Sequence, residues 1–324
     1  MSEPSGNTVE MRRVFADTLV ELGKAEPKII VLDNDVDLTS LTSVFRKAFP
    51  ERFVEIGIAE KNLFGTAAGL AASGFMAFPT TFAAFVVRCA LDQVAVSIAQ
   101  PALNVKIPGH YVGGSKAGAS HVAVEDVAIM RSLPNMRVAD PADNNDLRAV
   151  MRAAVAVQGP VYFRVNKLAL PDIFGPDHSF EWGTGEVLRP GHDVTIFSTG
   201  MLTPISLEAA RVLAAEGIDA EVIHLASIKP LDRDLVVSSV VRTGCAVSAE
   251  NGTVLGGLGS AIAETLGDMY PAPLRRIGYQ DIWAHSGSID QLLDRYGLRP
   301  SDVAEAARRS ISAKRDRVGS PSGS

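Results

Sequence analysis

The sequence has little of what marks nucleic-acid-binding, membrane or secreted proteins. Its 31 Lys and Arg residues are outnumbered by 37 Asp and Glu residues, for a formal net charge of −6, so it lacks the basic footprint that a nucleic-acid partner requires. No stretch approaches the run of about 20 apolar residues that spans a bilayer. The opening segment, MSEPSGNTVEMRR, lacks the apolar core of a signal peptide. We therefore expect a cytoplasmic protein with neither nucleic acid nor membrane among its partners.

Cysteine is also scarce. Cys89 and Cys245 are the only two, and their wide separation matches neither a disulfide framework nor a metal site. This usage fits a reducing compartment, and we assign no metal ligand to this chain. The remaining composition, 47% hydrophobic and 21% charged, is ordinary for a packed protein, and 324 residues suggest about two domains.

Short apolar segments alternate with helical patterns along the first half of the chain. Continuous apolar strands separated by helices predict a parallel sheet covered by helices on both faces. In such a sheet, ligands bind at the carboxyl ends of the strands. The expected strands are 28–32, 53–56, 75–78, 103–107, 136–138 and 161–165, and the expected first helix is 9–24.

A change of composition follows over residues 170–192, where Pro, Gly and polar residues interrupt the apolar pattern. A second alternating set comes after it, so the expected fold class is α/β with two parallel-sheet domains. The expected division is a disordered tail at 1–8, a first α/β domain at 9–175, a linker at 176–192, a second α/β domain at 193–315 and a disordered tail at 316–324. The expected second set has strands at 194–198, 220–225, 246–249 and 274–277, and helices at 204–215, 232–241, 256–266 and 301–315.

The stretch from Val54 to Phe85 carries the most informative residues. Glu60 stands at the expected start of a helix rich in Gly and Ala. Phe82 and Phe85 lie three apart, so if a helix begins there the two rings share a face. An aromatic face suits a flat heterocycle. The plainer interpretation of Glu60 is an acid that stabilises a helix N-terminus through the helix dipole.

This acid followed by paired aromatics resembles the pyrimidine-binding half of thiamine-diphosphate enzymes of the transketolase and deoxyxylulose-phosphate synthase group. The resemblance covers residues 9–313, including the segments IKPLD (228–232) and AENGTVLGGLGSA (249–261). It implies that Glu60 contacts the aminopyrimidine of the cofactor and that Phe82 and Phe85 hold its ring. The family's N-terminal domain, which binds the diphosphate and Mg²⁺ through a glycine–aspartate–glycine motif, has no counterpart in the sequence.

The same resemblance implies four substrate contacts. His110 and His121, in the segment GHYVGGSKAGASHVAVED, match a loop with two substrate-contacting histidines, and His121 is also assigned to proton movement in catalysis. Arg164 and Arg12 match substrate phosphate contacts, although Arg164 has a structural ion pair as its alternative. The sequence departs from the family at Ala117, where an aspartate touches the donor sugar, and at Leu41, where a serine completes the phosphate site.

The resemblance therefore implies the C-terminal subunit of a two-subunit transketolase. Such a subunit transfers a two-carbon ketol unit from a ketose, expected to be phosphorylated, to an aldose. It would act only with an N-terminal partner subunit that binds most of the thiamine diphosphate and Mg²⁺, in an α2β2 assembly. The alternatives are the β subunit of a 2-oxoacid dehydrogenase, a deoxyxylulose-phosphate synthase-like enzyme and a non-catalytic regulatory subunit.

Overall fold

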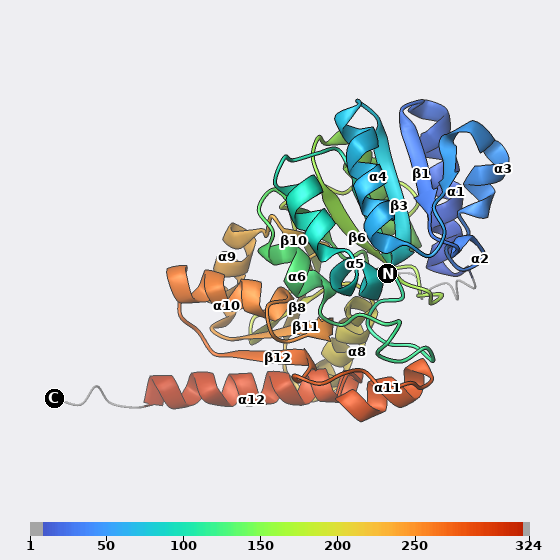
Figure 1. Ribbon diagram of the computed structural model, residues 1–324. Helices are drawn as coiled ribbons and strands as arrows, with labels where there is room; N and C mark the ends of the chain where they lie inside the picture. The colour runs from blue at the N-terminus through green and yellow to red at the C-terminus, as the bar shows by residue number, and fades with distance from the viewer. Residues whose placement is uncertain (1–8, 320–324) are drawn as a thin grey trace.

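The computed structural model describes residues 9–319, which form two α/β units side by side (Figure 1). The tail expected at 1–8 and residues 320–324 lie outside this range. The first unit contains a seven-stranded sheet in the order β10-β5-β6-β4-β3-β1-β2, and the second a five-stranded sheet in the order β12-β11-β8-β9-β7. Neighbouring strands are parallel except at two edges, where β10 pairs with β5 and β7 pairs with β9 in the antiparallel sense.

The elements of the first unit follow the expected alternation. The strands of its sheet are β1 (Ile29–Asp33), β2 (Phe53–Glu55), β3 (Met76–Phe82), β4 (Lys106–His110), β5 (Arg137–Ala139), β6 (Val161–Val165) and β10 (Ser227–Lys229). Its helices are α1 (Met11–Ala25), α2 (Asp37–Ser40), α3 (Ser43–Ala48), α4 (Glu60–Ala72), α5 (Ala83–Arg88), α6 (Asp126–Ser132) and α7 (Asn144–Ala156), with a 3-10 turn, η1 (Pro50–Arg52), and a π-helix, η2 (Gln93–Ala99).

The second unit repeats the design on a smaller scale. Its strands are β7 (Glu186–Arg189), β8 (Val194–Ser198), β9 (Ala220–His224), β11 (Ala246–Thr253) and β12 (Leu274–Tyr279). Its helices are α8 (Leu202–Ala215), α9 (Arg233–Thr243), α10 (Leu258–Met269), α11 (Ile289–Tyr296) and α12 (Pro300–Gly319). The sequence analysis missed β7, β10 and α11, and it ended the terminal helix at residue 315, four residues early.

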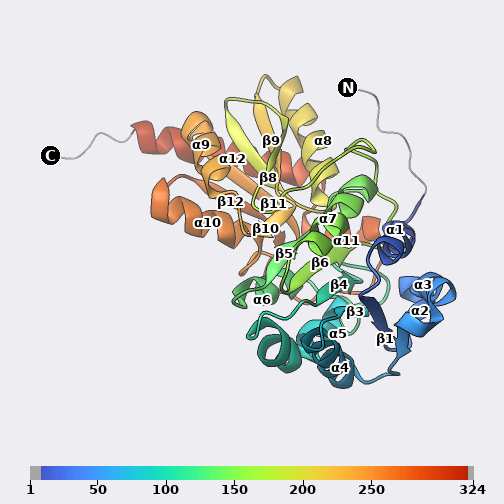
Figure 2. The ribbon, with the colours of Figure 1, turned by 90° about the horizontal axis from the view of Figure 1, so that it is seen from above.

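Successive side chains of a strand point to opposite faces, and β1 shows how this covers the first sheet. Ile29 and Val31 pack in the cluster that contains Phe15 of α1, whereas Leu32 packs in the cluster that contains Leu63 of α4. Figure 2 shows α1 and α4 on either side of the strands. The prediction of a parallel α/β fold is thus confirmed, with two antiparallel edge strands added.

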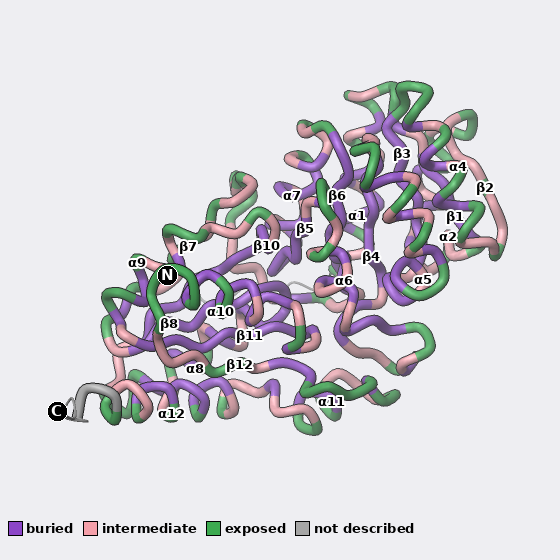
Figure 3. Tube along the Cα trace, turned by 60° about the vertical axis from the view of Figure 1, so that its left-hand side comes forward, coloured by how far each residue is buried: buried purple, intermediate pink, exposed green. Residues whose placement is uncertain are grey.

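The two units share more surface than a simple linker would create. The cluster around α1 and α7 continues into residues of α8 and α12. β10 comes from the second half of the sequence but pairs with β5 of the first sheet, and β7 lies in the expected linker but pairs with β9. Figure 3 shows buried residues in both units and around β10, where the two sheets come close. Among the described residues, no helix is long and apolar enough to cross a membrane.

Candidate active site

The predicted site residues gather at the carboxyl ends of neighbouring strands of the first sheet. Phe82 is the last residue of β3 and pairs in register with His110, the last residue of β4. Asn34 directly follows β1, whose final residue, Asp33, is in register with Thr80 of β3. Parallel strands end at one edge of a sheet, so residues distant in sequence meet there.

Glu60 is the first residue of α4, and the side chain of Asn34 holds its carboxylate. Asn34 Nδ2 donates to Glu60 Oε1 at 3.3 Å. Asn34 is 2% exposed, and its own Oδ1 is buried without a hydrogen-bond partner among the described residues. Glu60 is half-buried, so its carboxylate is held on one side by the protein and remains accessible. Sequence reasoning missed Asn34, although a polar residue directly after a buried strand is a signal for this edge.

Three aromatic rings cluster close to the carboxyl ends of β3 and β4. The ring centroids of Phe82 and Phe85 are 5.4 Å apart, and Tyr111 lies 4.5 Å from Phe82. Both phenylalanines are half-buried, so their rings can still contact a ligand. Tyr111 has a left-handed backbone with φ of 58°, a conformation that costs free energy in a non-glycine residue and often marks functional sites. Lys167 Nζ donates to the Tyr111 hydroxyl at 2.8 Å; neither residue was singled out from the sequence.

His121 projects from the loop after β4 toward the aromatic rings. Its ring centroid lies 5.4 Å from Phe85 and 6.0 Å from Phe82. Its Nδ1 is 3.0 Å from the hydroxyl of Ser120, and the residue is exposed. The structure therefore places His121 beside both phenylalanines.

His110 and Arg12 lie on the inner side of the same edge. His110 is 3% exposed, and its ring meets Phe15 edge-on at 5.0 Å. Burial, assisted by the positive charge of Arg12, lowers the pKa of His110 to about 3, so its ring is neutral at physiological pH. Its Nε2 has no partner among the described residues. Arg12 pairs with Glu10 at 2.5 Å and donates to the Thr39 carbonyl at 3.0 Å.

Arg164, near the carboxyl end of β6, is held in a buried ion-pair network. It is 1% exposed, and its guanidinium forms a two-pronged ion pair with Asp126. Its remaining terminal nitrogen, Nη1, donates to Asp140 at 3.2 Å and to Asn251 at 2.9 Å. Asn251 belongs to β11, so this buried group joins the two domains. The geometry is that of the structural ion pair, and we do not include Arg164 among the substrate contacts.

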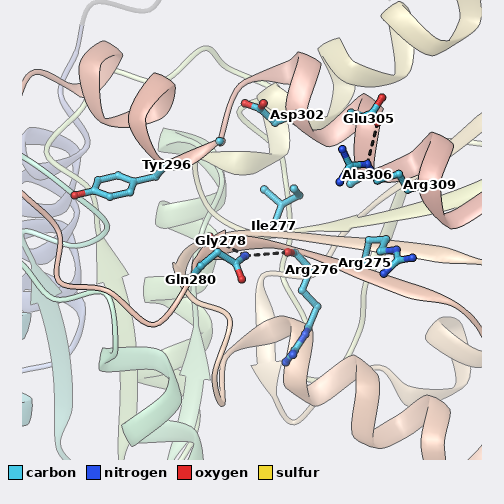
Figure 4. A pocket seen from close by; sticks show the side chains of 11 residues that line it. Arg275, Arg276, Ile277, Gly278, Gln280, Tyr296, Asp302, Glu305, Ala306 and Arg309 are labelled. Carbon is cyan, nitrogen blue, oxygen red and sulfur yellow. Dashed lines mark hydrogen bonds and ion pairs between the residues drawn. The ribbon is translucent and has the colours of Figure 1, made fainter.

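A separate cavity lies in the second domain. Figure 4 shows a cavity of about 330 Å³ between β12 and α12. Two of its three guanidinium groups already have partners: Arg309 pairs with Glu305 at 2.9 Å, and Arg276 donates to the Val254 carbonyl at 2.9 Å. The carboxyl ends of the strands in the first sheet are more open. Leu38, close to Asn34 in the sequence, is 81% exposed, and Ile58, close to Glu60, is 79% exposed.

The site residues at the carboxyl ends of these strands lie within residues 7–172, which match the pyrimidine binding domain of transketolase. The chain belongs to the transketolase family. The transketolase C-terminal domain matches residues 183–303, so the two matched segments correspond to the two sheets except for β10, which joins the first sheet from the second segment. The predicted resemblance is therefore confirmed.

Two relatives matched over nearly their full length are named as transketolase subunits. The chain is 40% identical to the 6-deoxy-6-sulfo-D-fructose transketolase subunit of Clostridium sp. (strain MSTE9), over 92% of this chain and 93% of that protein. It is 34% identical to an apulose-4-phosphate transketolase subunit of Phocaeicola vulgatus, over 94% of this chain and 98% of that one. By contrast, a 37% identical 1-deoxy-D-xylulose-5-phosphate synthase of Geobacter sulfurreducens is matched over only 48% of its length. This chain is thus a transketolase subunit that corresponds to the C-terminal half of longer relatives.

A solved structure agrees with this assignment. A split-gene transketolase, described as an inactive β4 tetramer, superposes with a TM-score of 0.88 at 46% identity, over 94% of this chain and 99% of that one. Undivided transketolase structures from Pichia stipitis, at 22% identity, superpose with a TM-score of 0.80 and share the fold. The fold and the extent of the chain therefore both match a transketolase β subunit.

Proposed function

We propose that this subunit completes a thiamine-diphosphate site with an N-terminal partner subunit and transfers a two-carbon ketol unit from a ketose to an aldose. The observation that carries the proposal is Glu60 held by Asn34 at 3.3 Å, at the sheet edge where Phe82, Phe85 and Tyr111 cluster. A carboxyl group beside aromatic faces fits an aminopyrimidine, because the acid can share a proton with a ring nitrogen and the aromatic rings offer a flat apolar surface.

Within this site, the chain's own residues have separate tasks. When bound, thiamine diphosphate supplies the nucleophilic carbon that accepts the two-carbon unit. Glu60 holds a proton at the pyrimidine ring nitrogen, and Phe82 and Phe85 fix the plane of the ring. His121, exposed beside these rings, binds sugar hydroxyls and moves protons during the transfer. These groups act chiefly by positioning.

The anionic end of the sugar has two cationic candidates on this chain. Arg12 lies close enough to His110 to lower its pKa. Lys167 reaches the site through the Tyr111 hydroxyl at 2.8 Å. Neutral His110, with its Nε2 unpartnered among the described residues, can accept from or donate to a sugar oxygen. The named substrates of the two relatives carry a sulfonate or a phosphate, which favours a ketose with a terminal anionic group.

The partner subunit supplies what this chain lacks. Among residues 9–319, no group of three or more His, Cys, Asp or Glu side chains could hold a metal ion. We assign the Mg²⁺ and diphosphate contacts to the N-terminal subunit because the family resemblance implies them there. Leu38 and Ile58, more than three-quarters exposed, present apolar surface for that subunit to cover. Two copies of each subunit, in an α2β2 assembly, would form two equivalent sites.

The test is turnover of a ketose phosphate with an aldehyde acceptor, thiamine diphosphate and Mg²⁺. The chain is assayed alone, then mixed with a candidate N-terminal transketolase subunit. Activity in the mixture alone is the expected result. Full activity of the partner alone would establish a regulatory role for this chain, and turnover of a 2-oxoacid with a lipoyl acceptor, without turnover of ketoses, would overturn the transketolase reaction.

A further inference from the structure

The loop that carries His121 has a closed base. Ala123 and Val112 form a β-bridge, and Gly113 N donates to the Ala123 carbonyl at 2.8 Å. The loop between them extends away from the first sheet and toward α11 of the second domain, where Figure 1 shows it in teal green. The position of His121 therefore depends on what supports this loop along its length.

The backbone of the loop lies directly against the second domain. The Tyr279 hydroxyl donates a hydrogen bond to the Gly113 carbonyl. A Cβ on Gly113 would lie 2.1 Å from Nδ2 of Asn251, and a Cβ on Gly118 would lie 2.4 Å from the hydroxyl of Ser286. Both glycines have left-handed backbones, with φ of 76° and 70°. Glycine is needed here for conformation and for close approach.

Arg88 holds the His121 end of the same loop. It donates to the carbonyls of Ala119 and Val122, the latter at 3.1 Å, and pairs with Glu125 at 2.5 Å. The Trp283 ring of the second domain stacks on its guanidinium at 4.9 Å from the centroid. Trp283 is 64% exposed, so packing in the core does not explain this large side chain. Its contact with Arg88 does. A cation placed over an indole face is favourable and directional.

We propose that the second domain positions the sugar-binding histidine: the segment 279–288 acts on His121 through Gly113, Gly118 and Arg88, and so sets the efficiency with which donor ketose is used. The inference rests on the proposed function for its kinetic consequence. Arg88, Tyr279 and Trp283 are positioning residues, since none of them touches the Glu60 and Phe82 surface. Loosening them displaces His121 and leaves the cofactor contacts of α4 and β3 in place.

The first test removes one atom. Tyr279→Phe keeps the ring and deletes the hydrogen bond to Gly113, and Tyr270→Phe, directly after α10, is the matched control. In the reconstituted complex, kcat/KM for the donor ketose is expected to fall by about tenfold, since small displacements of positioned groups have large effects on rate. The Kd for thiamine diphosphate should stay within about twofold. A uniform loss of cofactor affinity and activity would indicate a merely structural role and overturn the inference.

The second test removes the support under Arg88. Trp283→Ala should raise KM and lower kcat for the ketose, whereas Trp283→Phe, which retains an aromatic face, should recover most of the activity. Met269→Ala removes another exposed apolar side chain of the same domain and should change nothing. If Trp283→Ala matches the wild type, the second domain does not act through Arg88.

Hydrogen exchange of residues 112–123 separates this inference from the proposed function. Tyr279→Phe and Trp283→Ala should each speed exchange of the loop amides in the complex, with α4 unchanged. If the wild-type complex does not turn over ketoses but both variants still show faster exchange of the loop, the proposed reaction is overturned. The support of the loop by the second domain is then retained. Unchanged exchange in both variants would overturn the inference, whatever the substrate.

Discussion

Asn34 and Glu60, 26 positions apart in the sequence, meet through a single hydrogen bond of 3.3 Å from Nδ2 to Oε1. Asn34 follows β1 and Glu60 begins α4, so the bond ties the edge of the sheet to the start of a helix. Because Asn34 is almost fully buried, its side chain has little freedom to release the carboxylate. The pair fixes the direction of the acid on which the proposed chemistry depends.

Asn34→Ala is expected to lower kcat by about tenfold or more, because Glu60 loses the group that orients it. Asn104→Ala is the matched control: Asn104 precedes β4 at the opposite edge of the sheet and also has a buried Oδ1 without a partner among the described residues. Steady-state kinetics of both variants in the complex check the prediction. Equal kinetics for the two variants would contradict it.

Glu60→Gln keeps the size of the side chain and removes its negative charge. We expect turnover to fall by about 10² to 10⁴, the usual contribution of a positioned acid or base, with the thermal unfolding midpoint unchanged. Glu51→Gln, at a position 68% exposed, should retain full activity. Near-normal turnover by Glu60→Gln would end the assignment of Glu60 to the cofactor.

Arg164→Leu tests the structural interpretation of the buried arginine. Its removal leaves Asp126 and Asp140 buried without their cation, a change that typically costs about 3 to 5 kcal/mol of unfolding free energy. Denaturant unfolding should therefore show a clear loss of stability. A variant with wild-type stability and a raised KM for phosphorylated sugar would instead restore the phosphate contact first expected from the sequence.

Lys167→Met should show the opposite behaviour. Its amine is half-buried and contacts the Tyr111 hydroxyl, so its loss should leave stability nearly unchanged. KM for an anionic ketose should rise by about tenfold, because one charge-assisted hydrogen bond is worth roughly 1.5 to 3 kcal/mol. The KM of an uncharged ketose serves as the internal control, and an equal rise for both sugars would contradict an anion contact.

Lys106 predicts a pH dependence of stability. It is fully buried, and its Nζ donates to the carbonyls of Val157 and Gly159, each at 2.8 Å. Burial, with a smaller effect from Arg137, lowers the pKa of Lys106 from 10.5 to about 7. Between these values the unfolded chain binds the extra proton, so this residue makes the folded state more stable as pH rises.

The comparison with Lys106→Met isolates this contribution from other titrating groups. The unfolding free energy of the wild type relative to the variant should increase from pH 7 to pH 9, by about 2 kcal/mol in total, since one proton contributes at most about 1.4 kcal/mol per pH unit. Urea unfolding at several pH values provides the measurement. A difference that is constant with pH would show that the amine stays charged in the fold.

Local patterns predicted most of the fold. The strand at 161–165 and the strand at 194–198 were placed to the residue, because continuous apolar runs between turns have few alternative structures. β7 and β10 were missed because each is short and lies at the edge of a sheet, where its pairing depends on a strand remote in sequence. The expected linker at 176–192 thus includes β7, which is hydrogen-bonded to the second sheet.

The amino-acid sequence was sufficient for the family and for most of the succession of strands and helices, because these are carried by short motifs and local periodicity. The role of Arg164 required the folded chain. A guanidinium at a strand end can bind phosphate or close a buried ion pair, and the choice depends on Asp126 and Asn251, far away along the chain. The same holds for Asn34, Tyr111 and Trp283, whose positions are set by strand register and by contacts between domains that no local pattern encodes.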